Sequence, residues 1–257
     1  MSRQANMRLQ LMTWPEVEHY LENRRDVIVP IGSTEQHGPT GLIGTDALTA
    51  DAIAIRLGET VGAVVAPCLS IGMAHHHLAF KGTMTLRPTT LIAVVQDVVA
   101  SLARHGFQRV LFVNGHGGNI ATVNTAIQEI HAAASLAGMP SPVTAHLASW
   151  WDGPRVKGLS RELYGSQEGS HATASEVSVT WALHPDRVQD RVLDPQVAPS
   201  NGPWTDALDY RARHPDGRIG SNPALSRPEH GERLMAAAVE DLAERYRPWA
   251  GLEGGGR

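Results

Sequence analysis

The sequence of 257 residues predicts a single α/β domain with a mostly parallel sheet flanked by helices. Short β-branched runs alternate with longer segments of helical periodicity, and a hydrophobic fraction of 42% is enough for a packed core. Histidines and carboxylates gather where the predicted strands end. Because open α/β sheets bind ligands at the carboxyl ends of their strands, we expect these distant segments to form one site.

Four apolar runs predict the strands, since parallel strands buried on both faces read as nearly continuous apolar segments. They cover residues 27–31, 63–66, 110–113 and 143–149. The third run, Val-Leu-Phe-Val, is the clearest of them and breaks directly into a glycine-rich loop.

Capping signals and apolar periodicity predict the helices. Thr13 caps the first of them, with Pro15 in its first turn and Glu16 completing a capping box. Further helices are predicted over residues 45–58, 91–105, 120–138, 172–183 and 229–246. Residues 190–228 are rich in Pro, Gly and Asp and predict a long surface segment. The single domain should span residues 1–257, with a disordered tail from about residue 251.

Composition excludes several classes of partner. The net charge is −4 and no run of Lys or Arg is present, so nucleic acid is not expected as a partner. No stretch approaches the roughly 20 apolar residues that span a membrane. Cys68 is the only cysteine, and the N-terminal residues lack the apolar core of a signal peptide. We therefore expect a cytoplasmic protein without an intrachain disulfide.

Glu35 and His37 follow the first strand and are two positions apart, so an extended chain would send both side chains to the same side. Such a pair can ligate a metal ion, although a polar turn is the ordinary alternative. Asp46 stands at the start of the next predicted helix, where it could ligate a metal or simply cap the helix.

The loop after the third strand places His116 among three glycines. Glycines allow close approach of another group, and we expect Gly117 and Gly118 to contact a substrate. A phosphate cradle is the rival interpretation, but the P-loop Lys-Ser/Thr pair and the dinucleotide-binding spacing are both missing. Metal ligation by His116 is therefore favoured.

Other histidines and aromatic residues are less distinctive. At most two of the three consecutive histidines that end at His77 can face one site, and we assign His77 to substrate contact. His171 and Glu176 can both face the site only if His171 precedes the helix, because five helical positions span about 140°. Trp150 and Trp151 follow the fourth strand and could either belong to the core or wall a pocket for a flat ligand. Five further histidines are predicted to be surface or capping residues: His105, His131, His184, His214 and His230.

Several separated motifs, in the same order, resemble the creatininase family of amidohydrolases over roughly residues 14–247. They are Val29-Pro30-Ile31-Gly32-Ser33-Thr34-Glu35-Gln36-His37-Gly38-Pro39, Gly44-Thr45-Asp46, His77-Leu78-Ala79-Phe80-Lys81-Gly82-Thr83, Asn114-Gly115-His116-Gly117-Gly118-Asn119 and His171-Ala172 to Glu176. The resemblance implies a parallel α/β domain, a homohexamer and a site for two divalent metal ions. Zinc is expected first, with manganese or iron as alternatives.

The resemblance also implies roles for individual residues. Glu35, His37, Asp46 and His116 match metal ligands, with Asp46 in the bridging role, and His171 matches a residue that moves protons.

Two positions depart from the family's creatinine-hydrolysing members. Those members carry a ligating glutamate where this chain has Gly118, so Glu176 is predicted to supply the missing carboxylate. Lys81 replaces a usual proline, and we interpret it as facing solvent rather than an anionic substrate.

The expected reaction is hydrolysis of a C–N bond in a small cyclic amide or formamide by a metal-bridging hydroxide, with His171 protonating the leaving nitrogen. A peptidase-like or ring-opening branch of the family is one alternative. A metal-stabilised binding protein without turnover is another, and the complete ligand set with an intact His171 disfavours it.

Overall fold

The computed structural model describes residues 7–189 and 191–252. Its sheet contains four parallel strands in the order β2-β1-β3-β4, which confirms the predicted α/β fold. The strands are β1 (Asp26–Ile31), β2 (Val64–Val65), β3 (Arg109–Asn114) and β4 (Thr144–Ser149). Apart from residues 251 and 252, the tail predicted to be disordered lies outside the described residues.

Eight α-helices connect and cover the strands in the described part of the chain. They are α1 (Trp14–Asn23), α2 (Thr45–Val61), α3 (Pro88–Arg104), α4 (Asn119–Leu136), α5 (Pro154–Tyr164), α6 (Ala174–Leu183), α7 (Ala207–Arg213) and α8 (Pro228–Ala250). The predicted capping box is present, with the Thr13 backbone N–H donating to the Glu16 carboxylate at 2.6 Å. The sequence did not predict α5 or α7.

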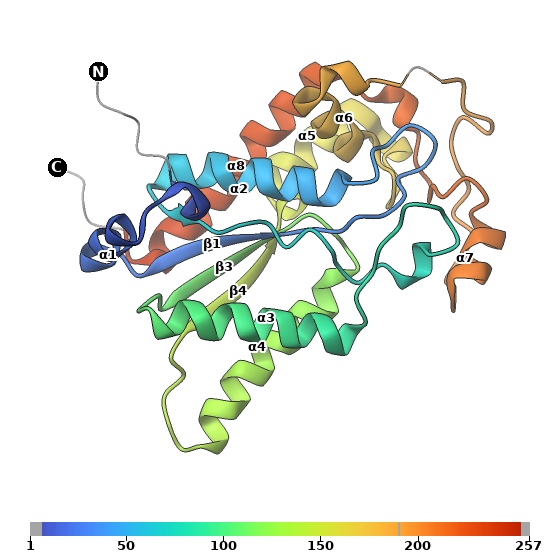
Figure 1. Cartoon of the computed structure of the whole chain (residues 1–257). Helices are drawn as coiled ribbons and strands as arrows, with labels where there is room; N and C mark the ends of the chain where they lie inside the picture. Colours follow the sequence, from blue (N-terminus) through green and yellow to red (C-terminus); the bar gives the residue numbers. More distant parts are fainter. Residues whose placement is uncertain (1–6, 190, 253–257) are drawn as a thin grey trace.

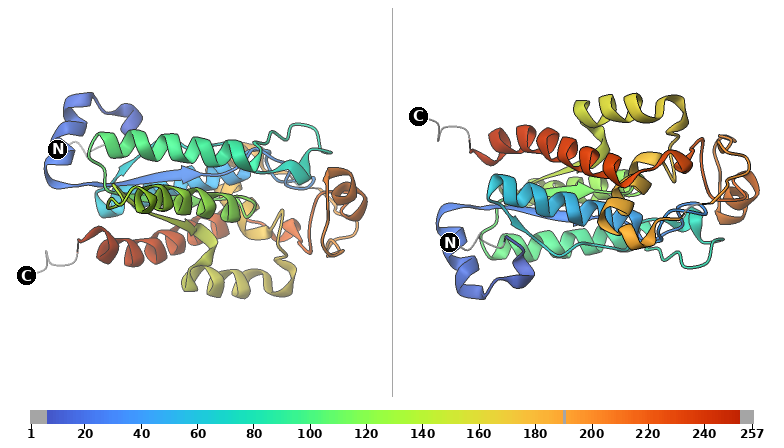
Figure 2. Two further views of the ribbon diagram at one scale, coloured as in Figure 1. Left: turned by 90° about the horizontal axis from the view of Figure 1, so that it is seen from below. Right: turned by 90° about the horizontal axis from the view of Figure 1, so that it is seen from above.

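The sheet separates two layers of helices (Figure 1). Helices α3 and α4 cover one face, and α2, α5, α6 and α8 lie on the other. The views from below and from above show α3 and α4 in front of the sheet in the first, and α2 and α8 in front of it in the second (Figure 2). Alternation along β1 explains both interfaces, because Val27 and Val29 pack with α3 while Ile28 packs with α2. All three side chains are fully buried.

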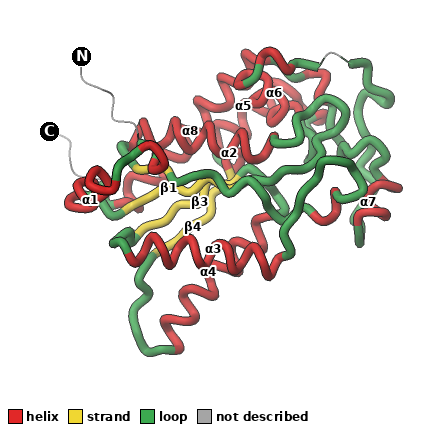
Figure 3. The backbone as a smooth tube through the Cα atoms, in the orientation of Figure 1, coloured by secondary structure: helices red, strands yellow, loops and turns green. Residues whose placement is uncertain are grey.

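The strands end in register at one edge of the sheet. Ile31 pairs with Asn114, which in turn pairs with Ser149. Long loops gather beyond this carboxyl edge (Figure 3). The topology therefore brings together the segments after β1 and β3, as the sequence predicted, and places the segment after β4 beside them.

The segment predicted as a surface stretch is largely exposed over residues 191–213, whereas residues 217–226 are buried or half-buried. The Arg218 guanidinium is 0% exposed, pairs with Asp216 at 2.7 Å and donates to the backbone carbonyls of Pro195, Gln196 and Ser221. Sequence composition did not predict this buried part, because Pro, Gly and Asp indicate local turns, whereas the buried Arg218 guanidinium contacts residues distant in sequence.

A second buried polar network ties the start of β1 to α8. The Asp26 carboxylate accepts hydrogen bonds from Arg24 Nε at 2.8 Å and from Tyr246 Oη at 2.5 Å. Burial opposes ionisation of Asp26, but these hydrogen bonds outweigh it and hold the carboxyl pKa below its usual value.

Among the helices of the described residues, none combines the length and the apolar character that a membrane span requires.

Candidate metal centre

Glycine at the end of β3 allows the first turn of α2 to lie against the loop that carries His116. A Cβ at Gly115 would stand 2.0 Å from the backbone oxygen of Asp46, so no other residue fits there. Gly44 is the N-cap residue of α2, and no side chain forms a capping hydrogen bond at this helix start. Asp46 therefore does not cap the helix, and its buried carboxylate faces the histidines instead.

The Glu35 carboxylate is buried among three histidines. His77 Nε2 lies 3.2 Å from Oε1, His116 Nε2 lies 3.2 Å from Oε2, and His171 Nδ1 lies 3.8 Å from Oε1. None of these rings is aligned to donate a hydrogen bond, so among the described residues both Glu35 oxygens lack a donor. A buried carboxylate in this condition is costly unless a cation compensates it.

Asp46 stands between two further histidines. His37 Nε2 lies 3.0 Å from Oδ1, and His116 Nδ1 lies 3.1 Å from Oδ2. We assign the tautomers from the outer contacts, with His37 Nδ1–H donating to the Glu35 backbone oxygen at 3.1 Å and His116 Nε2–H donating to Met73 O at 3.0 Å. The inner nitrogens then face Asp46 with lone pairs, an arrangement that needs either a proton or a metal ion.

Asn119 and Asn114 hold the loop around His116. Asn119 Nδ2 donates to Gly32 O at 3.0 Å, and its Oδ1 accepts from the Met73 backbone N–H at 3.1 Å. Asn114 Nδ2 donates to His116 O at 2.8 Å. Three segments, after β1, β2 and β3, are thus fixed relative to one another.

His171 lies in the loop before α6, the condition on which its pairing with Glu176 depended. Ala172, the next residue, has a φ of 52°, a left-handed conformation that costs energy for a residue with a Cβ. Thr173 is the N-cap, and its backbone N–H donates to Glu176 Oε1 at 2.6 Å. Glu176 consequently completes a capping box while also lying within reach of His37 and His171.

His77 is closer to the centre than the sequence predicted. The three histidines form a 3-10 turn rather than an extended segment, and this turn buries His76 and His77. Gln36 connects the surrounding groups, since its Nε2 lies 2.9 Å from His77 Nδ1 and 2.9 Å from His171 Nε2. No sequence signal identified Gln36, because its role depends on contacts across 135 residues of chain.

The electrostatics reflect these close contacts. Burial opposes the charge of His37, but Asp46 outweighs burial and raises the His37 pKa to about 10. Burial is likewise outweighed at His116, where Glu35 and Asp46 raise the pKa to about 9. Burial and neighbouring Asp46 raise the pKa of Glu176 to about 7, against the effect of His37. Burial, with His77 and His37, holds the His171 pKa well below its usual value.

Three groups of side chains have ligand atoms within 4.8 Å of one another. The groups are Glu35, Asp46 and His116; His37, His171 and Glu176; and Glu35, His77 and His171. The first two meet at Asp46, whose oxygens face one histidine of each group. The centre offers two kinds of metal ligand: carboxylate oxygens that accept no hydrogen bond, and the histidine nitrogens that face them. Together they suit divalent ions such as zinc or manganese.

Two cavities open beside the centre and share His116, Gly117, Ser170 and His171 as lining residues. One, of about 550 Å³, is also lined by Trp150 and Trp151, whose rings meet edge to face at 5.9 Å. The other, of about 470 Å³, includes His77 and Gly118. All five residues predicted to contact a substrate therefore line a cavity beside the histidines and carboxylates.

Trp204 and Thr205, just before α7, form one side of the second cavity. Trp204 stacks on His76 with ring centroids 5.5 Å apart, and burial lowers the His76 pKa to about 2. Tyr210 meets His77 edge to face at 4.6 Å. His214 was predicted to lie at the surface or to cap a helix. It is the C-cap residue of α7, but its ring is buried 5.0 Å from the ring of Tyr210 rather than exposed.

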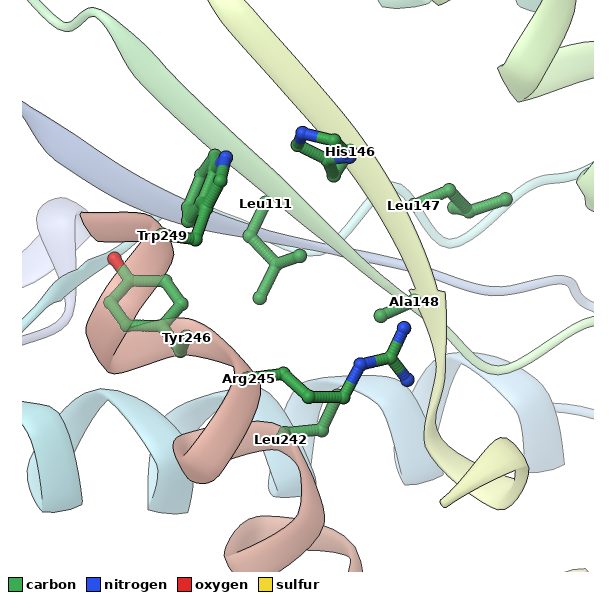
Figure 4. A pocket seen from close by; sticks show the side chains of 8 residues that line it. All are labelled: Leu111, His146, Leu147, Ala148, Leu242, Arg245, Tyr246 and Trp249. Atoms are coloured by element: carbon green, nitrogen blue, oxygen red, sulfur yellow. The ribbon is translucent and has the colours of Figure 1, made fainter. Parts of the chain in front are cut away.

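A third hollow lies away from this centre, between the sheet and α8 (Figure 4). It measures about 210 Å³ and is lined by Leu111, His146, Leu147, Ala148, Leu242, Arg245, Tyr246 and Trp249. It has no carboxylate and a single histidine, so it lacks the donor set of a metal centre. Lys81, in turn, is exposed and lines neither of the two cavities beside the centre.

The fold and the centre define an α/β protein with a candidate metal site at the carboxyl edge of a parallel sheet. The family model described as creatininase, creatinine amidohydrolase, matches residues 10–246. The chain therefore belongs to the creatininase family, whose members are hydrolases.

Curated relatives act on different substrates. Creatinine amidohydrolase of Pseudomonas putida is 32% identical over 255 residues, which cover 92% of this chain and 94% of that protein. Mycofactocin precursor peptide peptidase of Mycolicibacterium smegmatis is 28% identical over 238 residues, which cover 87% of this chain and 85% of that protein.

Solved structures share the whole fold. A structure described as creatininase Mn has a TM-score of 0.84 and 28% identity, and covers 95% of this chain and 99% of that chain. A mutant creatininase described as Zn-Zn type has a TM-score of 0.83 and 29% identity, with coverages of 95% and 98%.

Proposed function

We propose that this protein is a dinuclear metal-dependent amidohydrolase that cleaves a C–N bond of a small cyclic amide or formamide. The observation that carries the proposal is the pair of buried Glu35 oxygens without hydrogen-bond donors, beside inner histidine nitrogens that face Asp46. Divalent ions would satisfy all of these atoms at once. We prefer zinc, with manganese or iron as alternatives.

Two ligand sets support two ions. Glu35, Asp46 and His116 would hold one, and His37, Asp46 and Glu176 would hold the other, with Asp46 shared. Zinc-type ions, when bound, polarise a carbonyl group and lower the pKa of water towards 7. His37 and His116 would give up the protons that the carboxylates otherwise stabilise, so metal affinity should fall as the pH is lowered.

His171 is suited to move a proton at its Nδ1 atom. Its Nε2 lies 2.9 Å from the backbone oxygen of Gln36, which fixes the ring and leaves Nδ1 directed toward Glu35. Its lowered pKa keeps the ring neutral at neutral pH, ready to accept a proton and deliver it to the leaving nitrogen. Glu176 has a raised pKa and lies beside His171, so it is a second candidate for the group that delivers this proton.

A short peptide is the second candidate substrate, and one observation favours it. The two cavities meet at His116 and His171, so an extended chain could occupy both sides of the centre, whereas a small ring needs one side only. Each volume falls in the range of roughly 300–1,000 Å³ that is usual for ligand sites.

The test is metal analysis of the purified protein, followed by chelation, reconstitution with zinc or manganese, and assay on lactams, formamides and short peptides. We expect bound metal, loss of turnover on chelation and recovery on reconstitution. Asp46→Asn should lower metal content and abolish turnover, whereas Asp97→Asn, an exposed position on α3, should do neither. Full turnover by metal-free protein would refute the proposal.

We also propose that the protein assembles as a homohexamer, on the strength of the family relationship. Light scattering coupled to size-exclusion chromatography should give a mass of six chains of 27.7 kDa. A monomer at micromolar concentration would exclude this assembly.

A further inference from the structure

Helix α5 presents a polar stripe to the cavity that contains Trp150 and Trp151. Lys157, Ser160 and Arg161 all line this cavity of about 550 Å³. Residues three and four apart share one face of a helix, so these side chains form a continuous strip. Val156 and Tyr164 on the same helix are buried, and Val156 also lines this cavity beside the strip.

Arg161 is the notable member of this strip. Its side chain is exposed, and among the described residues its guanidinium has no ion-pair or hydrogen-bond partner. Lys157 Nζ lies 3.1 Å from Asp152, but both side chains are about half exposed, so their pairing is weak. The cavity therefore carries positive charge on one wall that the protein itself does not neutralise.

The carboxylates on the other walls of this cavity are already engaged. Glu168 accepts hydrogen bonds from the hydroxyl and the backbone N–H of Ser175. Glu176 accepts from the Thr173 backbone, and Asp46 faces its two histidines. None of these three carboxylates pairs with the Arg161 guanidinium, so an anionic ligand is a partner that fits it.

We propose that the substrate carries a carboxylate that Arg161 binds, with Lys157 adding positive charge, while the scissile amide lies at the metal centre. This inference rests on the proposed amidohydrolase function, because the cavity joins the α5 strip to Asp46, His116 and His171. A guanidinium matches a planar carboxylate with two parallel hydrogen bonds, which a neutral amide cannot accept as strongly.

The expected effect on the kinetics follows from the separation between Arg161 and the candidate metal ligands. Arg161 lines the cavity outside the three candidate ligand groups, so its contact should be the same in the ground state and the transition state. Such uniform binding changes KM and leaves kcat unaltered.

The experiment compares matched amides in whichever class the substrate panel shows to be hydrolysed. For formamides the pair is N-formyl-β-alanine and its amide, and for lactams it is 5-oxoproline and its amide. We expect the carboxylated member to have a kcat/KM higher by about tenfold or more. Arg161→Gln should raise KM for that member to the value of the amide, leave kcat unchanged and spare the neutral member.

Two further variants separate charge from structure. Arg161→Lys should recover part of the preference for the carboxylated substrate. Lysine restores the positive charge but lacks the planar guanidinium that forms two parallel hydrogen bonds with a carboxylate. Arg104→Gln, at the exposed C-terminal end of α3, removes one positive charge elsewhere and should leave both substrates unaffected. Equal KM values for the two members in the wild type, with Arg161→Gln inert, would overturn the inference while leaving the amidohydrolase proposal intact.

Calorimetry of chelated protein gives a readout without turnover. The same carboxylates should bind wild-type protein about tenfold more tightly than Arg161→Gln. If no amide of any class is hydrolysed by the reconstituted protein, the proposed function fails, and this titration still decides the role of Arg161. Equal affinity of the two proteins would then overturn it.

Discussion

Gly118 packs so closely against the candidate metal centre that one added methyl group should disturb it. A Cβ at this position would lie 2.3 Å from His116 Nε2 and 2.5 Å from the backbone oxygen of Met73. Ordinary contacts between such atoms are about 3.5 Å, so Gly118→Ala requires a movement of about 1 Å. The ring of His116 is freer to move than the backbone at Met73, which Asn119 holds.

This movement should act on metal binding more than on folding. The His116 ring lies 3.2 Å from Glu35 and 3.1 Å from Asp46, and both contacts would lengthen. We expect metal affinity to fall by about 10–100-fold, the range seen when groups that position metal ligands are altered. Overpacking of this kind costs about 1–3 kcal/mol of folding free energy, so the domain should still fold.

The assay is competition for zinc against a chromophoric chelator. Gly117→Ala provides a matched control, because a Cβ at Gly117 meets nothing within 4 Å. The control should bind zinc with wild-type affinity, while Gly118→Ala should bind it more weakly. Wild-type affinity in Gly118→Ala, with circular dichroism showing an intact fold, would refute the placement of His116 as a ligand.

Three further predictions concern stability. Asp26→Asn should cost about 2–4 kcal/mol at pH 7, because it breaks a buried pair at the start of β1 and weakens the Tyr246 hydrogen bond. The lowered pKa of Asp26 stabilises the protein above the unfolded-state pKa of about 3.9, and this contribution is lost as the pH falls through the folded-state value. Between pH 7 and pH 3.5, the free energy of unfolding measured with urea should therefore fall less in the variant than in the wild type. Equal decreases in the two proteins would contradict this role of Asp26. Gly231→Ala would place a Cβ 2.1 Å from Ser178 O, push α8 away from α6 and lower Tm by roughly 2–10 °C; an unchanged Tm in calorimetry would count against this packing. Zinc at about 100 times its Kd should stabilise the wild type by about 2.7 kcal/mol and raise Tm by roughly 5–11 °C, whereas an equal shift in Glu35→Gln would show that zinc binds elsewhere.

The strands and most helices could be predicted because their signals are local. The apolar runs along β1 and β3 are buried on both faces, so they read as nearly continuous apolar segments. Helix α5 escaped prediction because Gly153 and Pro154 at its start resemble a turn and Gly158 interrupts its apolar periodicity. Helix α7 has seven residues, too few for a periodic pattern to emerge.

The candidate centre was predictable in part. Glu35, His37, Asp46 and His116 follow strand ends or begin a helix, and parallel topology brings such positions together. The contact of His77 with Glu35 was not predictable, because a 3-10 turn rather than an extended chain sets the direction of its ring. The buried position of His214 depends on packing by a segment without apolar periodicity.

Part of the cavity walls comes from segments that carry no candidate ligand. Asn119 connects the loops after β1, β2 and β3, whereas α5 and the residues just before α7 contribute only to the walls. Substitutions in α5 can therefore reshape what enters the site without moving Glu35, Asp46 or His116. This separation allows substrate preference to diversify during evolution while the chemistry at the sheet edge stays the same.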